Sequence, residues 1–396
     1  MSKDDKYIPS GYKPSPLGPI PEDWEVKRLG EICTHFKSGI TITSKDIHED
    51  GLYPVYGGNG LRGYANTFTH DGSYILIGRQ GALCGNVNYV DGKNYISEHA
   101  IAVQTNENMQ WLKYKLENWN LNRFSESSAQ PGLSVEKLVR YKLSVPTLKE
   151  QNKIADILSL WDTAIAKQTA LIEKLTLRKR GLMQQLLTGK KRLEGFGGEW
   201  KEVRLGEIGV FFKGGGVPKD KITNSGNKCL TYGDLYTKYD FVISDVISYI
   251  DDHTANESVK IRYGDICFAG SGETKEDIGK CAAFIDNEYG YAGGDIIVFR
   301  ANDCNQITLS YILNSSDVIR QKSNMGQGHS VVHIYPYQLE KLLIKLPSRA
   351  EQDAIATILM ESDKEIEIQK QKLAAMQAQK KGLMQVLLTG KKRIEI

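Results

Sequence analysis

The sequence repeats itself, and this duplication constrains the fold more than any other feature of the chain. Residues 146–192 align without a gap to residues 347–393, at an offset of 201. A second repeated block, Trp-x₃-Arg-Leu-Gly-Glu-Ile, starts at Trp24 and again at Trp200, at an offset of 176. The chain is therefore a tandem duplication. Its copies begin and end alike, differ in between, and the second is the longer by 25 residues.

The repeated segment at the end of each copy has the apolar spacing of a long amphipathic helix. A proline stands just before each segment, and Gly189 and Gly390 mark the expected helix ends. A helix over 150–188 would be roughly 58 Å long at 1.5 Å per residue. The internal glycines Gly181 and Gly382 are weak helix formers, and they suggest a close crossing or a bend.

A helix of this length with one apolar stripe needs a partner, and the obvious partner is its own copy. Because the first helix must carry the chain into the second copy, the two helices are expected to run antiparallel about a pseudo-twofold axis. Gln168 and Gln369 fall on the predicted seam and would set its register. The residues predicted to pack the helix pair are Ile154, Leu158, Trp161, Ile165, Ile172, Leu175, Ile355, Leu359, Ile366, Leu373 and Met376.

The variable segments between the repeats have short apolar runs separated by Gly, Asn and Asp, which is typical of strands and turns. Each is expected to end in a short helix, over Trp111–Leu121 and Leu309–Lys322. The predicted fold is α+β: two pseudo-symmetric mixed α/β domains joined by two long antiparallel coiled-coil helices. The predicted segments are a tail at 1–20, a first domain at 21–146, a first helix at 147–192, a second domain at 193–347 and a second helix at 348–396.

Several functional classes are disfavoured by missing motifs. No apolar run approaches the ~20 residues of a membrane helix, and no signal peptide is recognisable, so a cytoplasmic location is expected. The six cysteines form no CxxC pair or zinc-ligand pattern. Gly58–Gly63 matches G-x-G-x-x-G, but no helical pattern follows it. Walker A, amino-methyltransferase and nuclease motifs are also missing. We therefore expect no catalytic centre, cofactor or metal site in this chain.

What remains are glycine-rich polar loops in both variable segments, of the kind that lets a backbone approach a ligand. Their Arg, Lys, Asn, Gln and Glu side chains suit base edges in DNA, and their hydroxyls suit phosphates. The alternative is that they are ordinary tight turns. The candidate DNA-binding residues are Asn59, Arg62, Tyr64, Arg79, Gln80, Ser97 and His99 in the first copy and Lys213, Lys219, Ser271, Glu273, Thr274, Lys275, Gln327 and His329 in the second.

Charge is distributed unevenly along the chain. The net charge is +3 overall, but residues 150–192 carry +5 and residues 193–350 carry −4. An acidic domain binds DNA weakly on bulk electrostatics. If the second domain binds DNA, we expect it to use a local basic patch, with a basic partner protein supplying further affinity.

Taken together, the repeated motifs resemble the specificity (S) subunits of type I restriction–modification systems over nearly the whole chain. The resemblance rests on the tandem plan, the Arg-Leu-Gly-Glu-Ile block, the Glu-Gln … Ile-Ala-x-Ile-Leu helix start and the Gly-Leu-Met-Gln-x-Leu-Leu-Thr-Gly helix end. It implies two target-recognition domains, each reading half of a bipartite double-stranded DNA site. It also implies helices that set the gap and dock two methyltransferase (M) subunits.

Restriction (R) subunits would join the same complex. By this resemblance, S-adenosylmethionine, ATP and Mg would be used by the partner subunits for adenine-N6 methylation and ATP-dependent cleavage. Two alternatives stay open from the residues alone. One is a similar module serving a different nuclease or methylase, and the other is a helical adaptor whose globular ends bind protein. For the tail at 1–20 we expect at most a contact with the end of the second long helix.

Overall fold

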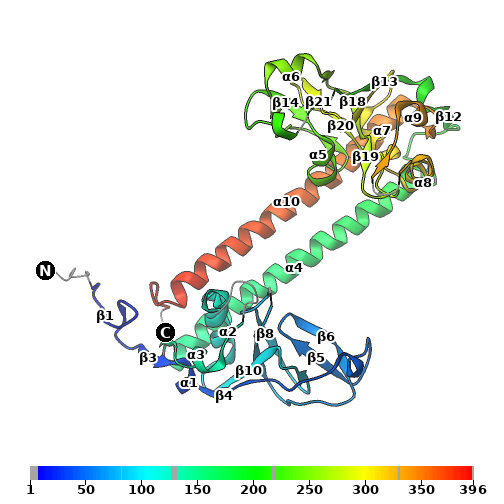
Figure 1. Ribbon diagram of the computed structural model, residues 1–396. Helices are drawn as coiled ribbons and strands as arrows, with labels where there is room; N and C mark the ends of the chain where they lie inside the picture. Colours follow the sequence, from blue (N-terminus) through cyan, green and yellow to red (C-terminus); the bar gives the residue numbers. More distant parts are fainter. Residues whose placement is uncertain are drawn as a thin grey trace. The chain divides into compact units, whose positions relative to one another are not determined.

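The computed structural model describes residues 8–81, 83–125, 132–215, 217, 219–328 and 331–394 (Figure 1). The chain forms two compact units, Met1–Ala170 with Lys370–Ile396, and Leu171–Gln369. Helices α4 (Leu148–Leu186) and α10 (Arg349–Leu387) each begin in one unit and end in the other. Each unit therefore combines one variable domain, the start of its own long helix and the end of the other.

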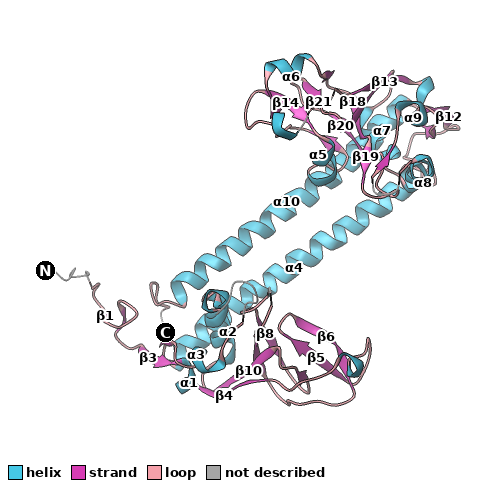
Figure 2. Cartoon of the chain, viewed as in Figure 1, coloured by secondary structure: helices cyan, strands magenta, loops and turns pink. Residues whose placement is uncertain are grey.

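The first unit is built on an all-antiparallel sheet of order β4-β10-β7-β8 and a smaller sheet of order β6-β5-β9, in which β5 and β9 run parallel (Figure 2). The elements of this unit before α4, including the strands of both sheets, are β1 (Tyr12–Lys13), β2 (Ile20–Pro21), β3 (Glu25–Arg28), α1 (Leu29–Ile32), β4 (Cys33–Ser38), β5 (Tyr53–Gly57), β6 (Gly60–Ala65), β7 (Tyr74–Gly78), β8 (Val87–Val90), β9 (Tyr95–Ile96), β10 (Ala100–Thr105), α2 (Met109–Asn118), α3 (Val135–Leu138) and β11 (Lys142–Val145).

The second unit repeats this plan with additions. Its sheets have the orders β13-β22-β18-β20-β15 and β16-β14-β21-β17, with β14 and β21 parallel. Its elements are β12 (Lys201–Arg204), β13 (Gly209–Lys213), β14 (Asn227–Leu230), α5 (Tyr232–Thr237), β15 (Val242–Ile243), β16 (Tyr249–Ile250), α6 (Asp252–Asn256), β17 (Val259–Ile261), β18 (Asp265–Ala269), β19 (Ser271–Gly272), β20 (Cys281–Phe284), β21 (Gly290–Ala292), β22 (Ile296–Ala301), α7 (Gln306–Leu313), α8 (Ser316–Met325), β23 (Val332–His333), α9 (Pro336–Leu339) and β24 (Leu343–Leu346).

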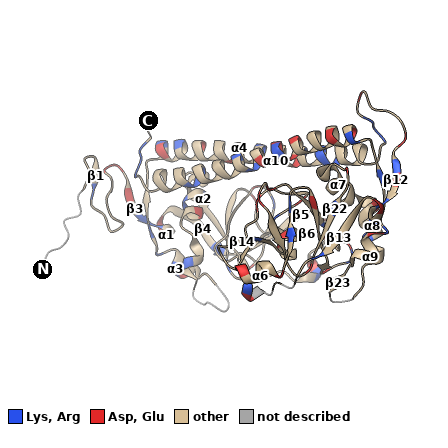
Figure 3. Cartoon of the chain, turned by 90° about the horizontal axis from the view of Figure 1, so that it is seen from above, with Lys and Arg blue, Asp and Glu red and all other residues tan. Residues whose placement is uncertain are grey.

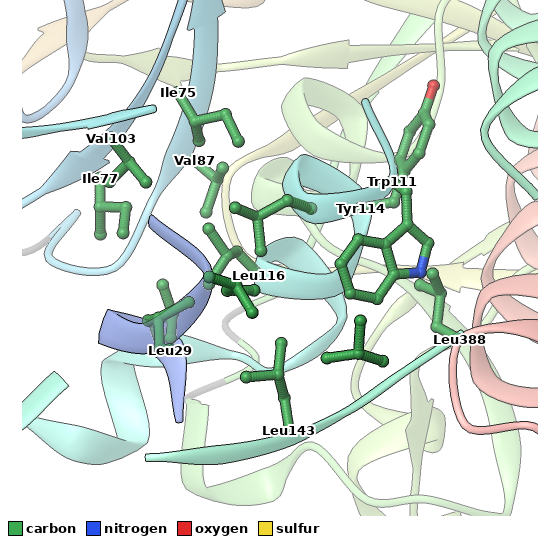
Figure 4. Packing of buried hydrophobic residues seen from close by; sticks show 14 of the residues in the cluster. Leu29, Ile75, Ile77, Val87, Val103, Trp111, Tyr114, Leu116, Leu143 and Leu388 are labelled. Carbon is green, nitrogen blue, oxygen red and sulfur yellow. The ribbon is translucent and has the colours of Figure 1, made fainter. Parts of the chain in front are cut away.

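The repeated Leu-Met-Gln-x-Leu-Leu motif supplies core residues to the domain at which each long helix ends. Met384, Leu387 and Leu388 belong to the apolar core of the first unit, and Figure 4 shows Leu388 beside the indole ring of Trp111. Leu186 and Leu187 hold the equivalent place in the second unit. The motif is therefore part of the core of the domain at which its helix ends, a role that the apolar spacing alone did not indicate.

The helix segments inside each unit run antiparallel and are joined by matching ion pairs. In the first unit, Lys380 binds Asp162 at 2.5 Å and Arg393 binds the buried Glu150 at 2.9 Å. Lysine, arginine and both acids recur at the equivalent positions of the second unit, as Lys179 with Asp363 and Arg192 with Glu351. Residues of both charges are interspersed along α4 and α10 (Figure 3).

The Glu-Gln motif fixes the short domain helix to the start of each long helix. Gln151 Nε2 donates to the carbonyl of Pro146, and its Oε1 accepts from the backbone N–H of Asn108 at 2.9 Å. Gln352 makes the same pair of contacts with Pro347 and Asn305. These bonds locate α2 and α7 relative to α4 and α10.

The predicted fold class is confirmed, with local corrections. Both long helices have 39 residues, and Gly189 and Gly390 follow them at φ +69° and +74°. Apart from the glycine, its two chain neighbours and its own helix backbone, no described atom lies within 4 Å of a Cβ placed at Gly181 or Gly382, so neither glycine marks a close crossing.

The predicted helix Leu309–Lys322 is wrong as a single element, because the chain forms α7 and α8 with a break at Asn314 and Ser315. Asn314 leaves the helical conformation, and its side chain binds the carbonyls of Cys281 and Ser310 instead. The G-x-G-x-x-G sequence lies in the β5–β6 hairpin, as expected for a segment with no helix behind it. The N-terminal segment does touch the end of α10, because Tyr12 Oη donates to the carbonyl of Gly390 at 2.6 Å.

The residues predicted to pack the helix pair divide into two groups. Those at the helix starts, Ile154, Leu158, Ile355 and Leu359, are fully buried in the domain cores. Farther along, Leu175 and Ile366 are buried, and the remaining five are half-buried: Trp161, Ile165, Ile172, Leu373 and Met376. Gln168 is buried and Gln369 half-buried. Only the residues of the second group, which lie outside the domain cores, are available for contacts within the helix pair.

Candidate DNA interface

Three loops of the first unit meet at one end of its sheets. The N–H of Arg79, just after β7, donates to the carbonyl of His99 at 2.9 Å, and the N–H of Ser97 donates to the carbonyl of Tyr56 at 2.8 Å. A Cβ at Gly58 would lie 2.8 Å from the His99 carbonyl oxygen, so this approach requires glycine. The loops around residues 57–60, 78–81 and 97–99 therefore form one continuous surface.

The side chains on this surface form a small polar network. His99 Nδ1 lies 3.1 Å from Oε1 of Gln80, and His99 Nε2 lies 3.3 Å from Oε1 of Glu98. The other oxygen of Glu98 accepts the backbone N–H of Ile42 at 3.3 Å. Glu98 was not among the predicted contacts, although a carboxylate is the usual acceptor for the cytosine amino group. Its place between His99 and the 40–43 loop makes it a further candidate.

The predicted residues of the first copy differ in accessibility. Asn59, Arg62 and Gln80 are exposed, whereas Tyr64 in β6 and Arg79 are half-buried. Ser97 is fully buried, and its Oγ has no hydrogen-bond partner within the described residues. The Ser97 hydroxyl does not reach the surface, so we leave it out of the contacts proposed below.

In the second unit, the 326–334 segment meets the loop after β18. The N–H of Ile334 donates to the carbonyl of Gly270 at 2.9 Å, and His333 Nδ1 lies 2.9 Å from Oγ of Ser271. Gln327 and His333 exchange backbone hydrogen bonds of 2.9 and 2.7 Å. Lys213, at the end of β13, has its ammonium 6.0 Å from the ring centre of Tyr335.

Side-chain hydrogen bonds hold the backbone of the loop after Ser271 in place. Tyr236 Oη lies 3.1 Å from the carbonyl oxygens of both Ser271 and Asp277, which share its single proton. Burial raises the pKa of Tyr236 above its usual range, so the hydroxyl stays protonated and able to donate. Thr274 Oγ1 donates to Asp277 at 2.7 Å, which closes the loop. Its remaining side chains are thus presented on an ordered backbone.

The predicted residues of the second copy also differ in accessibility. Glu273, Thr274, Lys275 and Gln327 are exposed, and Lys213 is exposed at the edge of the surface. Ser271 is buried and bound to His333, so it is also left out of the proposed contacts. His329 and the side chain of Lys219 lie outside the described residues.

The structure shows which loops of the two copies correspond. The loops at 78–81 and 269–275 are equivalent, but 213–219 and 326–330 do not correspond to 53–64 and 97–99. The true counterpart of 97–99 is 293–295, because Gly293 donates to the Leu230 carbonyl and Gly270 to the Asp295 carbonyl as Ser97 and Arg79 do in the first unit. Tyr232, which follows β14 and is 39% exposed, and Asp295 are therefore further candidate DNA contacts that were not predicted from the sequence. Finding them requires the parallel pairing of β14 with β21.

Two kinds of feature are absent from the described residues. No cluster of three or more His, Cys, Asp or Glu side chains suits a metal ion in the described ranges. No helix in this part of the chain is both long enough and apolar enough to cross a bilayer.

Comparison with known proteins decides the family. The model of the type I restriction modification DNA specificity domain matches the chain twice, at residues 21–177 and 197–378. The chain belongs to this family. It is a type I restriction–modification specificity subunit, with one matched copy for each repeat of the sequence.

Individual relatives of this specificity subunit agree with that assignment. The EcoprrI specificity subunit of Escherichia coli is 46% identical over 143 residues, which is 35% of this chain and 35% of that protein. The MjaVIII specificity subunit of Methanocaldococcus jannaschii is 25% identical over 95% of this chain and 94% of its own length.

Solved structures of low sequence identity share the fold. The type I S subunit from M. genitalium superposes with a TM-score of 0.61 at 15% identity, covering 94% of this chain and 96% of that one. A chain from a study of complex assembly and conformational transition of the type I R–M system gives 0.59 at 16% identity, covering 94% of this chain and 99% of that one. The architecture of the specificity subunit is thus that of known S subunits.

Proposed function

We propose that this subunit gives a type I restriction–modification complex its DNA sequence specificity without catalysing a reaction itself. Each variable domain reads one half of a bipartite double-stranded site. The long helices set the gap between the halves and dock two methyltransferase subunits. Restriction subunits then complete the nuclease.

One observation supports two half-site readers more than any other. Both units present three converging loops at the same place on the same sheet plan, yet the side chains differ at equivalent positions. Arg79 and His99 of the first unit correspond to Gly270 and Asp295 of the second. Base edges in the major groove are distinguished by such donor and acceptor differences. Equivalent scaffolds with different loop chemistry suit two different half-sites.

Exposed apolar side chains on the long helices support a protein partner there. Leu160 and Leu177 of α4 are 71% and 66% exposed, and Ile368 of α10 is 51% exposed. Large apolar side chains on a helix already paired on another face suit a further helix or domain. Methyltransferase subunits are the partners that membership in this family favours.

The chemistry of the complex would lie in those partners. S-adenosylmethionine would be bound by the methyltransferase subunits, and ATP and Mg would be needed by the restriction subunits. We propose that this chain needs no cofactor for its own role and that the complex works in the cytoplasm, where the DNA is.

Binding to DNA with the methyltransferase present tests this function. We expect the complex of the full chain with its methyltransferase to retard a bipartite DNA site in a gel. Changing either half-site separately should weaken the retardation. A helical adaptor whose ends bind protein would show no dependence on either half-site, and that result would contradict the proposal.

A further inference from the structure

The second domain carries a surface column of two stacked aromatic rings with a cation beside each. The rings of Tyr335 and Tyr337 are stacked, with centres 6.0 Å apart and planes within 10° of parallel. The ammonium of Lys213 lies 6.0 Å from the centre of the Tyr335 ring, and that of Lys341 lies 5.7 Å from the Tyr337 ring. Of these four residues, only Lys213 was predicted from the sequence. The other three members come from the segment around α9.

The column begins next to the loop at 269–275. Tyr335 directly follows Ile334, whose N–H binds the carbonyl of Gly270 in the loop that carries Glu273 and Lys275. Gln338 holds the segment in place, accepting the N–H of Tyr335 at 2.9 Å and donating to the carbonyl of Met325 at 2.6 Å. The rings therefore stand on an anchored backbone next to the candidate base-reading loop.

The column is accessible, and its charges are not neutralised nearby. Tyr337 is 52% exposed, and Lys213 and Lys341 are exposed. Within the described residues, neither lysine forms an ion pair and neither tyrosine hydroxyl forms a hydrogen bond. By contrast, Lys228 in the same unit contacts three carboxylates, those of Asp245, Asp286 and Glu288. Tyr335 is half-buried, so the two lysines and Tyr337 are the members of the column most open to a ligand.

The first unit has a different arrangement at the equivalent place. Gly30 donates to the carbonyl of Val139 as Gly206 donates to that of Glu340, which makes Glu136 and Arg140 the counterparts of Tyr337 and Lys341. Arg140 binds Glu136 at 2.6 Å, so that pair cancels its own charge. The cationic column belongs to the domain whose residues 193–350 have a net charge of −4. That domain is the one that needs a local basic patch to approach DNA.

We propose that Lys213, Tyr335, Tyr337 and Lys341 bind the phosphate backbone of the DNA beside the bases read by the 271–275 loop. This inference rests on the proposed DNA-reading function. Lysine ammonium and tyrosine hydroxyl groups are ordinary phosphate ligands, and such contacts fix register and orientation without carrying sequence information. The stacked rings hold both cations at a fixed place on the surface.

The test uses the full chain in complex with its methyltransferase. Affinity is measured by fluorescence anisotropy over a salt series, on the cognate bipartite site and on unrelated DNA. For the double variant Lys213→Gln/Lys341→Gln, we expect roughly 10-fold weaker binding at low salt to both DNAs and a salt slope shallower by about 2. Tyr337→Phe keeps the stack but removes one hydroxyl, and it should weaken both DNAs by a smaller factor.

A matched pair elsewhere in the second unit serves as the control. Lys260, in β17, lies 3.6 Å from the ring centre of Tyr289, which is 52% exposed and directly precedes β21, whereas the 293–295 loop follows that strand. Lys260→Gln should leave the affinity and the salt slope unchanged.

Equal effects of the control and the double variant would overturn the inference, as would wild-type binding by the double variant. If the double variant lost discrimination between the two DNAs, the lysines would be base readers and the phosphate assignment would be wrong. Failure of the wild-type complex to prefer cognate DNA would instead refute the proposed function itself.

Discussion

Lys115 is a lysine buried in the core of the first unit with no carboxylate partner among the described residues. Its ammonium nitrogen donates to Oγ of Ser144 at 3.1 Å and to the carbonyl of Leu388 at 2.5 Å, just past the end of α10. Burial lowers the pKa of Lys115 to about 7. The second unit places apolar Ile312 at the equivalent point of α7. Lys115 thus donates a hydrogen bond to the carbonyl just past the end of α10, which the apolar side chain of Ile312 cannot do in the second unit.

The lowered pKa predicts a pH-dependent contribution to stability. Between the folded pKa of about 7 and the ordinary value of 10.5, the unfolded chain binds a proton at Lys115 that the folded chain does not. The free energy of unfolding therefore rises with pH in this window, and below it the penalty for burying the charge is fully present. Lys115→Met removes this term. We expect the stability of the wild type relative to the variant to rise by roughly 2 kcal/mol from pH 7 to 9. Urea unfolding at both pH values measures it, and a constant difference would contradict the assignment.

Reading of one half-site by the first unit predicts a one-sided effect of a loop variant. Arg79 follows β7 at the meeting point of the three loops, and its backbone binds His99. Arg79→Ala should relax discrimination at one half-site by about 1–3 kcal/mol and leave the other half intact. Glu273→Ala in the second unit is the matched variant and should relax the other half. Binding to a panel of sites mutated in each half checks both, and equal losses in both halves for either variant would refute the division of labour.

At the scale of single residues, the sequence predicted which loops meet more reliably than which of their side chains are exposed. Glycine clusters located the loops at 57–60, 78–81 and 269–275, because their close backbone approaches require glycine. Burial of Ser97 and Ser271 could not be predicted, since it depends on tertiary packing. Asp295 and Tyr232 were not among the predicted contacts, because their place beside these loops follows from a parallel strand pairing that leaves no local pattern.

At the scale of elements, each long helix contains an internal glycine that lowers its stability. Gly181 and Gly382 lie inside α4 and α10, and a Cβ at either position meets no atom within 4 Å. Glycine in a helix costs up to about 1 kcal/mol relative to alanine. Gly181→Ala and Gly382→Ala should each raise the free energy of unfolding by about 0.5–1 kcal/mol. Chemical denaturation checks this, with Gly189→Ala as the control.

The control variant is expected to behave in the opposite way. Gly189 has φ +69°, a conformation that alanine adopts only with strain. Gly189→Ala should therefore destabilise the protein. If Gly181→Ala or Gly382→Ala also destabilised it, these glycines would have a packing or partner-binding role that the described residues do not reveal.

Elements were predictable where sequence periodicity and end signals agreed. The proline before each long helix and the glycine after it located both 39-residue helices to within a few residues. The break between α7 and α8 was not predictable, because it depends on hydrogen bonds from Asn314 to a distant strand. Ion pairs such as Asp162 with Lys380 follow from the antiparallel arrangement only once the register is known.

At the scale of the whole molecule, the duplication explains why each unit is assembled from distant parts of the chain. Each long helix starts in the domain that precedes it and ends in the core of the other, so the units share two continuous helical connections. The repeat in the sequence predicted this exchange in outline. It did not predict that Leu388 and Leu187 complete the partner domain's core.

If the helices set the gap, lengthening both should lengthen it. Seven residues inserted after Ala170 and seven after Gln369 fall at the boundaries between the units and leave the ion pairs within each unit intact. The insertion adds about 10 Å of helix, or roughly three base pairs at 3.4 Å each. We expect both half-sites to be kept and the unread gap to grow by this amount. Selection of bound sites from a random library measures the gap, and an unchanged gap would mean that the helices do not set it.

The central claim is that this chain alone selects one bipartite site for adenine methylation by its partner. Single-molecule sequencing of methylated DNA tests it most directly, in cells that make the methyltransferase with and without this chain. We predict N6-methyladenine at a single two-part motif only when the chain is present, with one half changed by Arg79→Ala and the other by Glu273→Ala. Methylation that is independent of the chain, or confined to one continuous motif, would contradict the account.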